Sequence, residues 1–208
     1  MHLSQKQLFL QHLAQTTDFP LSIEIDKAEG LYLYTPEGKR YLDLISGISV
    51  SNVGHRHPKV VAAIKEQVDK YLHLMVYGEY IQKPAVQLTK LLAQNLPKSL
   101  NTTYLVNSGT EAIEGALKLA KRATGRSEII AAHKAYHGNT MGSMSVMGNE
   151  ERKQAFRPLL PNIRFINFNN ETDLKNITTK TACVILETIQ GGAGFIEPKN
   201  DYLAKVKT

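Results

Sequence analysis

Hydrophobic and polar positions change their pattern near residue 102. From there onward, short apolar runs alternate with longer segments whose apolar residues recur at helical spacing, so strands and helices are expected to alternate. This alternation is typical of an α/β fold with a mainly parallel, doubly wound sheet. The predicted strands are Tyr104 to Val106, Glu128 to Ala132, Ile163 to Phe168 and Ala182 to Leu186.

In the N-terminal part of the chain, the hydrophobic and polar patterns extend over fewer residues than in the part after residue 102. Ser4 and Gln7 have the spacing of a capping box, which predicts a short helix to about Gln15. Apolar residues then alternate around two turn signals, Ala28-Glu29-Gly30 and Pro36-Glu37-Gly38. This alternation predicts a small antiparallel meander.

A loop rich in Gly, Ser and His follows the meander, from Ser46 to Pro58. Pro58 suits the first turn of a helix, and a further helix is predicted from about Pro84 to Leu96. We therefore expect residues 1–52 to form an N-terminal helix-and-meander segment, part of a small domain. Residues 53–208 are expected to form the first part of a large α/β domain.

The corner after the first predicted strand carries the clearest chemistry. Ser108 is followed three residues later by Glu111, which is a capping-box spacing and predicts that a helix begins at this turn. The free N–H groups and the dipole of a helix start could hold a phosphate at the edge of a sheet. A capped turn of this kind also occurs in units that bind nothing, so the corner alone leaves both interpretations open.

Three turns are expected to meet beyond the carboxyl ends of the strands, where ligands bind in such sheets. Turn A (residues 108–110) offers backbone donors, turn B (residues 135–140) an aromatic ring beside a glycine, and turn C (residues 187–192) a carboxylate and an amide. These groups suit pyridoxal phosphate better than a dinucleotide, because Gly-x-Gly-x-x-Gly is absent after the first strand.

Composition restricts the classes of partner. The 208 residues carry a formal charge of +6, but Lys and Arg are dispersed among acidic residues, so nucleic acid is not an expected partner. Cys183 is the only cysteine, which excludes intrachain disulfides and predicts a reducing, cytoplasmic setting. No apolar run is long enough to span a bilayer, and no signal-peptide pattern is present at the N-terminus, so no membrane association is expected.

Two histidines, His55 and His57, lie two residues apart, and His73 follows 16 residues later. No acidic or cysteine residue completes a recognisable ligand set around them, so no metal site is predicted. We expect His55 and His57 to make hydrogen bonds within their loop instead.

Five motifs, in this order and spacing, carry a family resemblance. The chain resembles the class III pyridoxal-phosphate aminotransferases, which include acetylornithine, ornithine and 4-aminobutyrate aminotransferases. The resemblance covers essentially the whole chain and implies a fold type I, pyridoxal-phosphate-dependent transferase of which this chain is the N-terminal part. The motifs are Gly30 with Tyr41-Leu42-Asp43, Gly54-His55-Arg56-His57-Pro58, Asn107-Ser108-Gly109-Thr110-Glu111-Ala112, Tyr136-His137-Gly138 and Glu187-Thr188-Ile189-Gln190-Gly191.

The resemblance implies a role for each matching position. Turn A would bind the cofactor phosphate, Tyr136 would stack on the pyridine ring, and Glu187 would orient polar groups around the ring. The cofactor-binding residues implied in this way are Ser108, Gly109, Thr110, Tyr136, His137, Glu187 and Gln190.

Three further positions concern the substrate. Ile48 lies where the family has a substrate-pocket residue. Asn139 stands where family members usually have an Arg that clamps a substrate carboxylate, and Gly192 stands where they commonly have a Glu. These two departures favour the branches that act on amines or on diaminopelargonate-type substrates.

The remaining catalytic residues are expected outside this sequence. By resemblance, the lysine that forms the Schiff base with the cofactor and the aspartate that pairs with its pyridine nitrogen lie beyond Thr208. Lys118, Lys121 and Lys134 are expected to be solvated surface residues. The chain is therefore expected to be a truncated part, inactive alone, of a homodimeric aminotransferase that passes an amino group from a small-molecule donor to a 2-oxo acid.

Two other interpretations stay open at this point. The parent protein could be an aminomutase or a decarboxylase that uses the same cofactor and the same fold. Alternatively, the chain could be a non-catalytic dimerisation or regulatory fragment.

Overall fold

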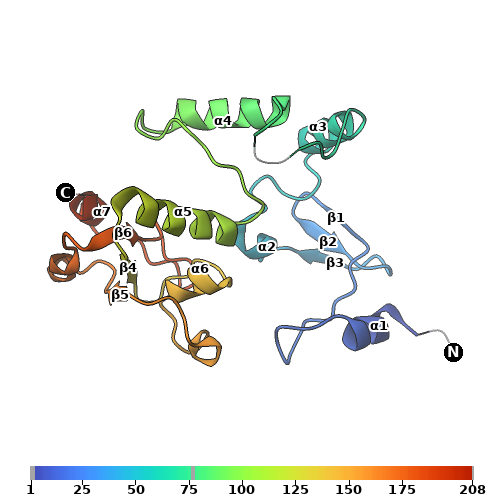
Figure 1. Cartoon of the computed structure of the whole chain (residues 1–208). Coiled ribbons are helices and arrows are strands. Elements are labelled where there is room, and N and C mark those ends of the chain that lie inside the picture. Colours follow the sequence, from blue (N-terminus) through green and yellow to red (C-terminus); the bar gives the residue numbers. More distant parts are fainter. Residues whose placement is uncertain (1–2, 76–77, 208) are drawn as a thin grey trace. The chain divides into compact units, whose positions relative to one another are not determined.

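The computed structural model describes residues 3–75 and 78–207. The chain divides into two compact units, Met1–Ile81 and Gln82–Thr208, whose elements are labelled in Figure 1. The predicted division after residue 52 concerns domains of the complete protein and stays a prediction.

The first unit begins with a capped helix and the predicted meander. Ser4 Oγ accepts the N–H of Gln7 at 3.2 Å, while Gln7 Oε1 accepts the N–H of Ser4 at 2.8 Å, which confirms the capping box. The helix ends at His12, earlier than predicted. β1 pairs antiparallel with β2, and β2 with β3. The elements are α1 (Gln5–His12), β1 (Lys27–Glu29), β2 (Tyr32–Tyr34), β3 (Arg40–Leu42), α2 (Ser46–Ser49) and α3 (Pro58–Val68).

The loop after the meander contains a left-handed turn. Ser46, Gly47, Ile48 and Ser49 have φ values of 51°, 61°, 65° and 63°, a region that is costly for residues other than glycine. Asp43 holds this turn, since its Oδ1 accepts the N–H of Ser46 at 2.8 Å and its Oδ2 lies 2.7 Å from His55 Nε2. His55 thus makes a hydrogen bond, as predicted, but to Asp43 just before the loop, whereas Nδ1 of His57 is buried with no hydrogen-bond partner among the described residues.

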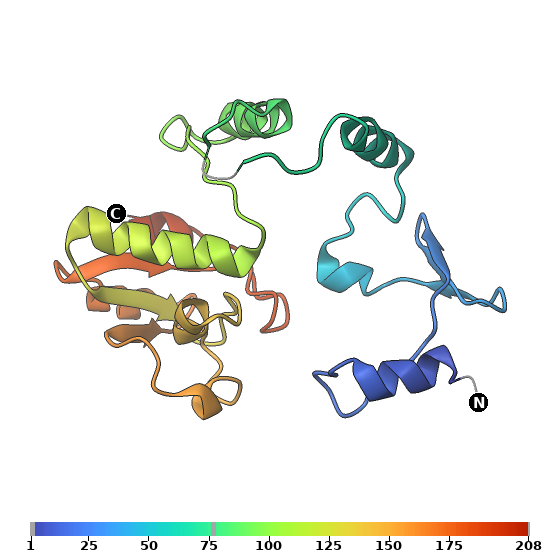
Figure 2. The ribbon, with the colours of Figure 1, turned by 45° about the vertical axis from the view of Figure 1, so that its right-hand side comes forward.

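The second unit contains a three-stranded parallel sheet in the order β5-β4-β6, seen beneath α5 in Figure 2. β4 lies in the centre, and its residues 129–132 are fully buried, as expected for a strand covered on both faces. The elements are α4 (Lys83–Asn95), α5 (Gly109–Thr124), β4 (Glu128–Ala132), α6 (Met141–Ser145), η1 (Gln154–Phe156), β5 (Ile163–Ile166), η2 (Glu171–Asn176), β6 (Thr181–Ile185) and α7 (Tyr202–Lys207).

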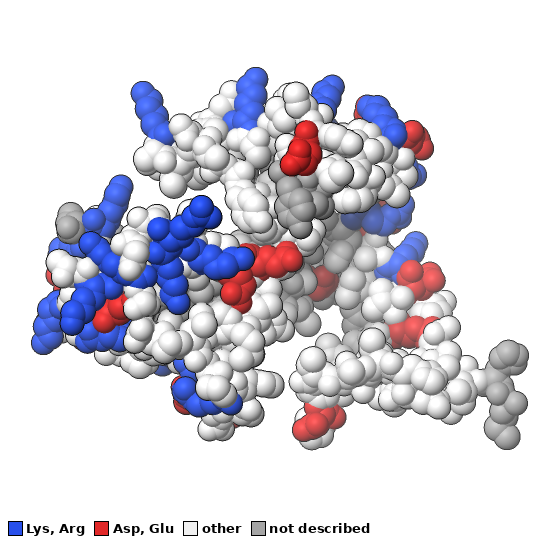
Figure 3. Space-filling model, viewed as in Figure 1, with Lys and Arg blue, Asp and Glu red and all other residues white. Residues whose placement is uncertain are grey.

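Helix α5 covers one face of this sheet through Leu117, which packs with Ile129, Ala131 and Val146 in the core. Figure 3 shows acidic side chains near the start of α5 and basic ones over the remainder. This distribution suits the helix dipole, whose positive end lies at the N-terminus. In the part of the chain that the structure describes, no helix is both long and apolar enough to cross a lipid bilayer.

One predicted strand is absent from the part of the chain that the structure describes, and two others differ in their bounds. Tyr104 to Val106 form no strand among the described residues, and all three side chains are exposed. β-propensity is insufficient here because a strand needs a partner, and the two neighbours of β4 are β5 and β6. The other three predicted strands are confirmed, although β5 ends two residues early and β6 is shifted by one.

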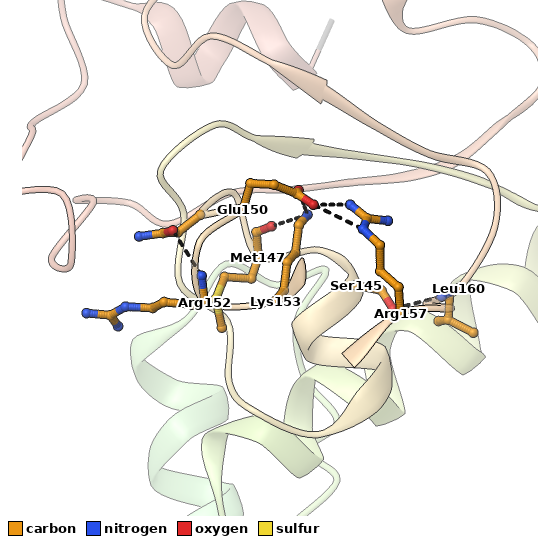
Figure 4. Close-up of polar contacts among 8 residues, drawn as sticks. Ser145, Met147, Glu150, Arg152, Lys153, Arg157 and Leu160 are labelled. Carbon is orange, nitrogen blue, oxygen red and sulfur yellow. Dashed lines mark hydrogen bonds and ion pairs between the residues drawn. The ribbon is translucent and has the colours of Figure 1, made fainter. Parts of the chain in front are cut away.

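A buried lysine organises the connection from β4 to β5 (Figure 4). Lys153 is only 3% exposed, its Nζ donates to the carbonyl of Met147 at 2.7 Å, and it lies 4.2 Å from the centre of the Phe165 ring. Burial lowers the pKa of Lys153, against the opposing effect of the Glu150 carboxylate 3.6 Å away. Glu150 also pairs with Arg157. Polar contacts thus hold the part of this connection that follows α6.

Candidate functional site

Turn A lies at the start of α5, as predicted, but with a modified cap. Ser108 Oγ accepts the N–H of Glu111 at 3.3 Å. The carboxylate of Glu111 accepts the N–H of Asn107 at 2.8 Å rather than that of Ser108, so only half of the predicted capping box is present. Ser108 and Gly109 are exposed, and a Cβ added at Gly109 would meet no atom within 4 Å. The start of α5 is therefore open to a ligand.

The Thr110 side chain faces turn B. Its Oγ1 lies 2.7 Å from Thr140 Oγ1 and 2.7 Å from Ser143 Oγ. Gly138 passes so close that an added Cβ would lie 2.4 Å from Thr110 Oγ1, and its φ of +128° also requires glycine. The hydroxyl of Thr110 thus holds turn B against α5, and a phosphate at this end would meet backbone N–H groups.

Glu114 makes a second contact between α5 and turn B, which the sequence analysis missed. Its Oε1 accepts hydrogen bonds from Thr140 Oγ1 at 2.5 Å, from Gly142 N at 2.8 Å and from Ser143 N at 3.1 Å. Burial opposes ionisation of this carboxyl, but the hydrogen bonds outweigh it and lower the pKa of Glu114 below its ordinary value. The one available signal was its spacing of four residues from Thr110, which places both on one helix face.

Turn C is joined to turn B by Glu187. Its Oε2 accepts the N–H of Tyr136 at 3.0 Å, and its Oε1 accepts the N–H of Gly191 at 3.3 Å. The side chain of Tyr136 remains 45% exposed, although its backbone is held. Glu187 therefore positions an accessible aromatic ring.

His137 and Gln190 are buried beside these turns. His137 is 8% exposed, and its Nε2 has no hydrogen-bond partner among the described residues. Burial lowers the pKa of His137, and the Glu187 carboxylate only partly opposes this effect. Gln190 is 1% exposed and its Nε2 donates to the carbonyl of His133 at 2.9 Å. The side-chain amide of Gln190 therefore holds turn C to the end of β4.

Comparison with known proteins decides the family. The family described as aminotransferase class-III matches residues 13–208. The chain belongs to the class III aminotransferases. It is 39% identical to an acetylornithine aminotransferase of Clostridium acetobutylicum, over 88% of this chain and 48% of the relative. It is 40% identical to a putative LysW-aminoadipate semialdehyde/glutamate semialdehyde transaminase of Pyrococcus horikoshii, over 89% of this chain and 50% of the relative.

Solved structures show the same fold for this class III chain. An adenosylmethionine-8-amino-7-oxononanoate aminotransferase of Methanocaldococcus jannaschii matches 97% of the chain and 50% of its own, with 29% identity and a TM-score of 0.85. A taurine:2-oxoglutarate aminotransferase of Bifidobacterium kashiwanohense, solved with PLP and glutamate, matches 96% and 51%, with 27% identity and a TM-score of 0.82. These matches confirm the expected fold type I, and the chain spans about half the length of the relatives it matches.

Class III aminotransferases use pyridoxal phosphate, and the site residues of this chain fit such a group. The open start of α5 can accept a phosphate, and the exposed ring of Tyr136 can accept an aromatic ring. The buried Nε2 of His137 is a polar atom still in need of a partner. These features belong to a single compact unit.

The predicted substrate positions of this class III chain are divided between its units. Asn139 and Gly192 are exposed in the second unit, where a Cβ added at Gly192 would lie 3.5 Å from Tyr136 Cβ. Ile48 belongs to the first unit, on the left-handed turn, and is 83% exposed. Among the lysines considered from sequence, Lys118 and Lys134 are exposed and Lys121 is half-buried.

Proposed function

We propose that this chain supplies the phosphate-binding and ring-binding part of the cofactor site in an aminotransferase that transfers an amino group from a small-molecule donor to a 2-oxo acid. The observation that supports it most is the joining of turns A, B and C. Thr110 contacts Thr140 at 2.7 Å, and Glu187 accepts the N–H of Tyr136 at 3.0 Å. An open helix start and an accessible aromatic ring are thereby held in one site.

Each residue has a definite task in this proposal. The N–H groups at the start of α5 and the Ser108 hydroxyl hold the phosphate, with the helix dipole adding to the attraction. Tyr136 packs on the pyridine ring, while Glu187 and Gln190 hold the turns that present it. When bound, pyridoxal phosphate supplies an electron-withdrawing ring that stabilises negative charge at the reacting carbon of the donor. The lysine that holds the cofactor covalently is assigned to the other half of the complete protein.

The donor is proposed to be a simple amine rather than an ω-amino acid. Asn139 is a neutral amide, which cannot make the two parallel charged hydrogen bonds that an Arg makes to a carboxylate. Gly192 likewise provides no side chain beside Tyr136. Recognition of a substrate carboxylate at these two positions is therefore weak.

A binding measurement with the 208-residue chain tests the cofactor site. Pyridoxine 5′-phosphate is the probe, because it has the ring and the phosphate but no aldehyde to react with lysines. Tyr136→Ala should weaken its binding about tenfold, since an aromatic pair contributes about 0.5–1.5 kcal/mol beyond its buried area. Phe156→Ala, which removes another exposed aromatic ring of the same unit, should leave binding unchanged. Equal affinity of wild type and Tyr136→Ala would contradict the proposal.

The complete protein is needed for the reaction and the assembly. An amino-donor comparison of 4-aminobutyrate, acetylornithine, lysine and simple amines should show the highest rate with a simple amine, because neither residue 139 nor residue 192 offers a cation to a donor carboxylate. Fastest turnover of acetylornithine would refute the assignment of the donor class. We also propose that the complete protein is a homodimer, which its mass in solution tests directly.

A further inference from the structure

The start of α6 is pressed against the first two turns of α5. A Cβ added at Gly142 would lie 2.1 Å from Glu114 Oε2, just as one at Gly138 would lie 2.4 Å from Thr110 Oγ1. Two glycines four residues apart therefore let residues 138–142 lie directly on the helix. The segment that follows Tyr136 has its path set by α5.

Glu114 provides the polar part of this contact. Three donors from residues 140–143 converge on a single carboxylate oxygen, Oε1, at 2.5 Å, 2.8 Å and 3.1 Å. Two of these donors are the backbone N–H groups of Gly142 and Ser143 in the first turn of α6, where no preceding helical carbonyl is available to accept them. Bonds to an ionised carboxylate are stronger than bonds to a neutral acceptor, so Glu114 ties α5 firmly to Thr140 in turn B and to the start of α6.

We infer that Glu114 is a positioning residue that sets the spacing between the phosphate-binding start of α5 and the ring of Tyr136. The inference rests on the proposed function, because it concerns the phosphate and the ring of one ligand. Glu114 itself touches neither of them. Its effect reaches the ligand through Gly142, Thr140 and the backbone that leads back to Tyr136.

The position of Tyr136 depends on two carboxylates with different tasks. Glu187 holds the N–H of Tyr136 to turn C, whereas Glu114 holds the following residues to α5. Loss of Glu114 therefore leaves turn B attached to turn C, and attached to turn A through the Thr110 hydroxyl alone, so that the spacing between turns A and B is less firmly fixed. A ligand that must satisfy both turns A and B loses affinity, while a ligand that needs only turn A does not.

NMR titration of the 208-residue chain separates these two effects. The Gly109 amide signal reports on turn A, and the ring signals of Tyr136 report on turn B. Inorganic phosphate should shift the Gly109 signal with the same affinity, within about twofold, in wild type and in Glu114→Ala. Pyridoxine 5′-phosphate should shift both signals in wild type but bind about tenfold more weakly to Glu114→Ala, with a smaller shift of the Tyr136 ring.

Three further variants keep the inference falsifiable. Glu114→Gln should restore wild-type binding within about threefold, because an amide oxygen can take the place of Oε1. Glu114→Asp, which is one methylene too short, should bind like Glu114→Ala and replaces it if the alanine variant does not fold. Ile166→Val, which reduces packing in β5 away from the site, should change neither titration.

The outcomes distinguish this inference from the function on which it rests. If wild type shows no shift with pyridoxine 5′-phosphate, the proposed function fails and the role of Glu114 fails with it. Suppose instead that wild type shows both shifts. If Glu114→Ala then loses affinity for phosphate and for pyridoxine 5′-phosphate equally, or loses affinity for neither, the cofactor site stands and the positioning role is overturned.

Discussion

Substitution of Gly142 by alanine tests the close contact between α5 and α6. The new methyl group would lie 2.1 Å from Glu114 Oε2, so the carboxylate has to swing away. Gly142 N then loses its acceptor, whereas Thr140 Oγ1 keeps the hydroxyl of Thr110 at 2.7 Å. Loss of a hydrogen bond to a charged group costs about 1.5–3 kcal/mol. Alanine in place of glycine in a helix regains about 0.5–1 kcal/mol, so the net loss of unfolding free energy should be about 1–2 kcal/mol.

The same substitution should have the opposite effect on the free energy of unfolding once Glu114 is absent. In a Glu114→Ala background the methyl group meets no carboxylate, and Gly142→Ala should be neutral or stabilising by up to about 1 kcal/mol. The coupling in a double-mutant cycle is therefore about 2 kcal/mol. Urea unfolding of the four chains, followed by circular dichroism, measures it.

Gly148→Ala is the matched control for this cycle. Its methyl group would lie 2.3 Å from the carbonyl oxygen of Ala132 and 2.4 Å from Lys134 N, both of which are backbone atoms. It should therefore destabilise both backgrounds equally. If Gly142→Ala also lowers the free energy of unfolding by the same amount in both backgrounds, the contact between Gly142 and Glu114 does not contribute to stability.

Two buried ionisable groups predict how stability depends on pH. Burial lowers the pKa of His137, so the unfolded chain binds a proton more readily than the folded chain. The free energy of unfolding should therefore fall as the pH drops below about 6.5. The urea midpoints at pH 7.5 and at pH 5.5 should differ less in His137→Asn than in wild type. Burial also lowers the pKa of Lys153, so stability should rise with pH as the ordinary lysine value near 10.5 is approached. Urea unfolding between pH 8 and 10 should lack this rise in Lys153→Met, and an unchanged slope would show that Lys153 is not the group responsible.

Local features of the fold could be predicted from the sequence because they depend on neighbouring residues. The capping box of Ser4 and Gln7 and the helix start at Pro58 are of this kind. The strand Glu128–Ala132 was predicted with its correct bounds, since a central parallel strand is apolar at nearly every position. Tyr104 to Val106 have a similar pattern but no partner strand, and the sequence pattern does not report on partners.

The sequence by itself determined the family, the parallel α/β fold and the three turns of the candidate site, because each is carried by a run of adjacent residues. Only the tertiary structure decided what the polar side chains do there. The Thr110 hydroxyl faces turn B, and the Glu187 carboxylate holds the backbone of Tyr136. Glu114 contacts residues 26 to 29 positions further along the chain. Such contacts depend on how two helices pack, which no spacing within either helix encodes.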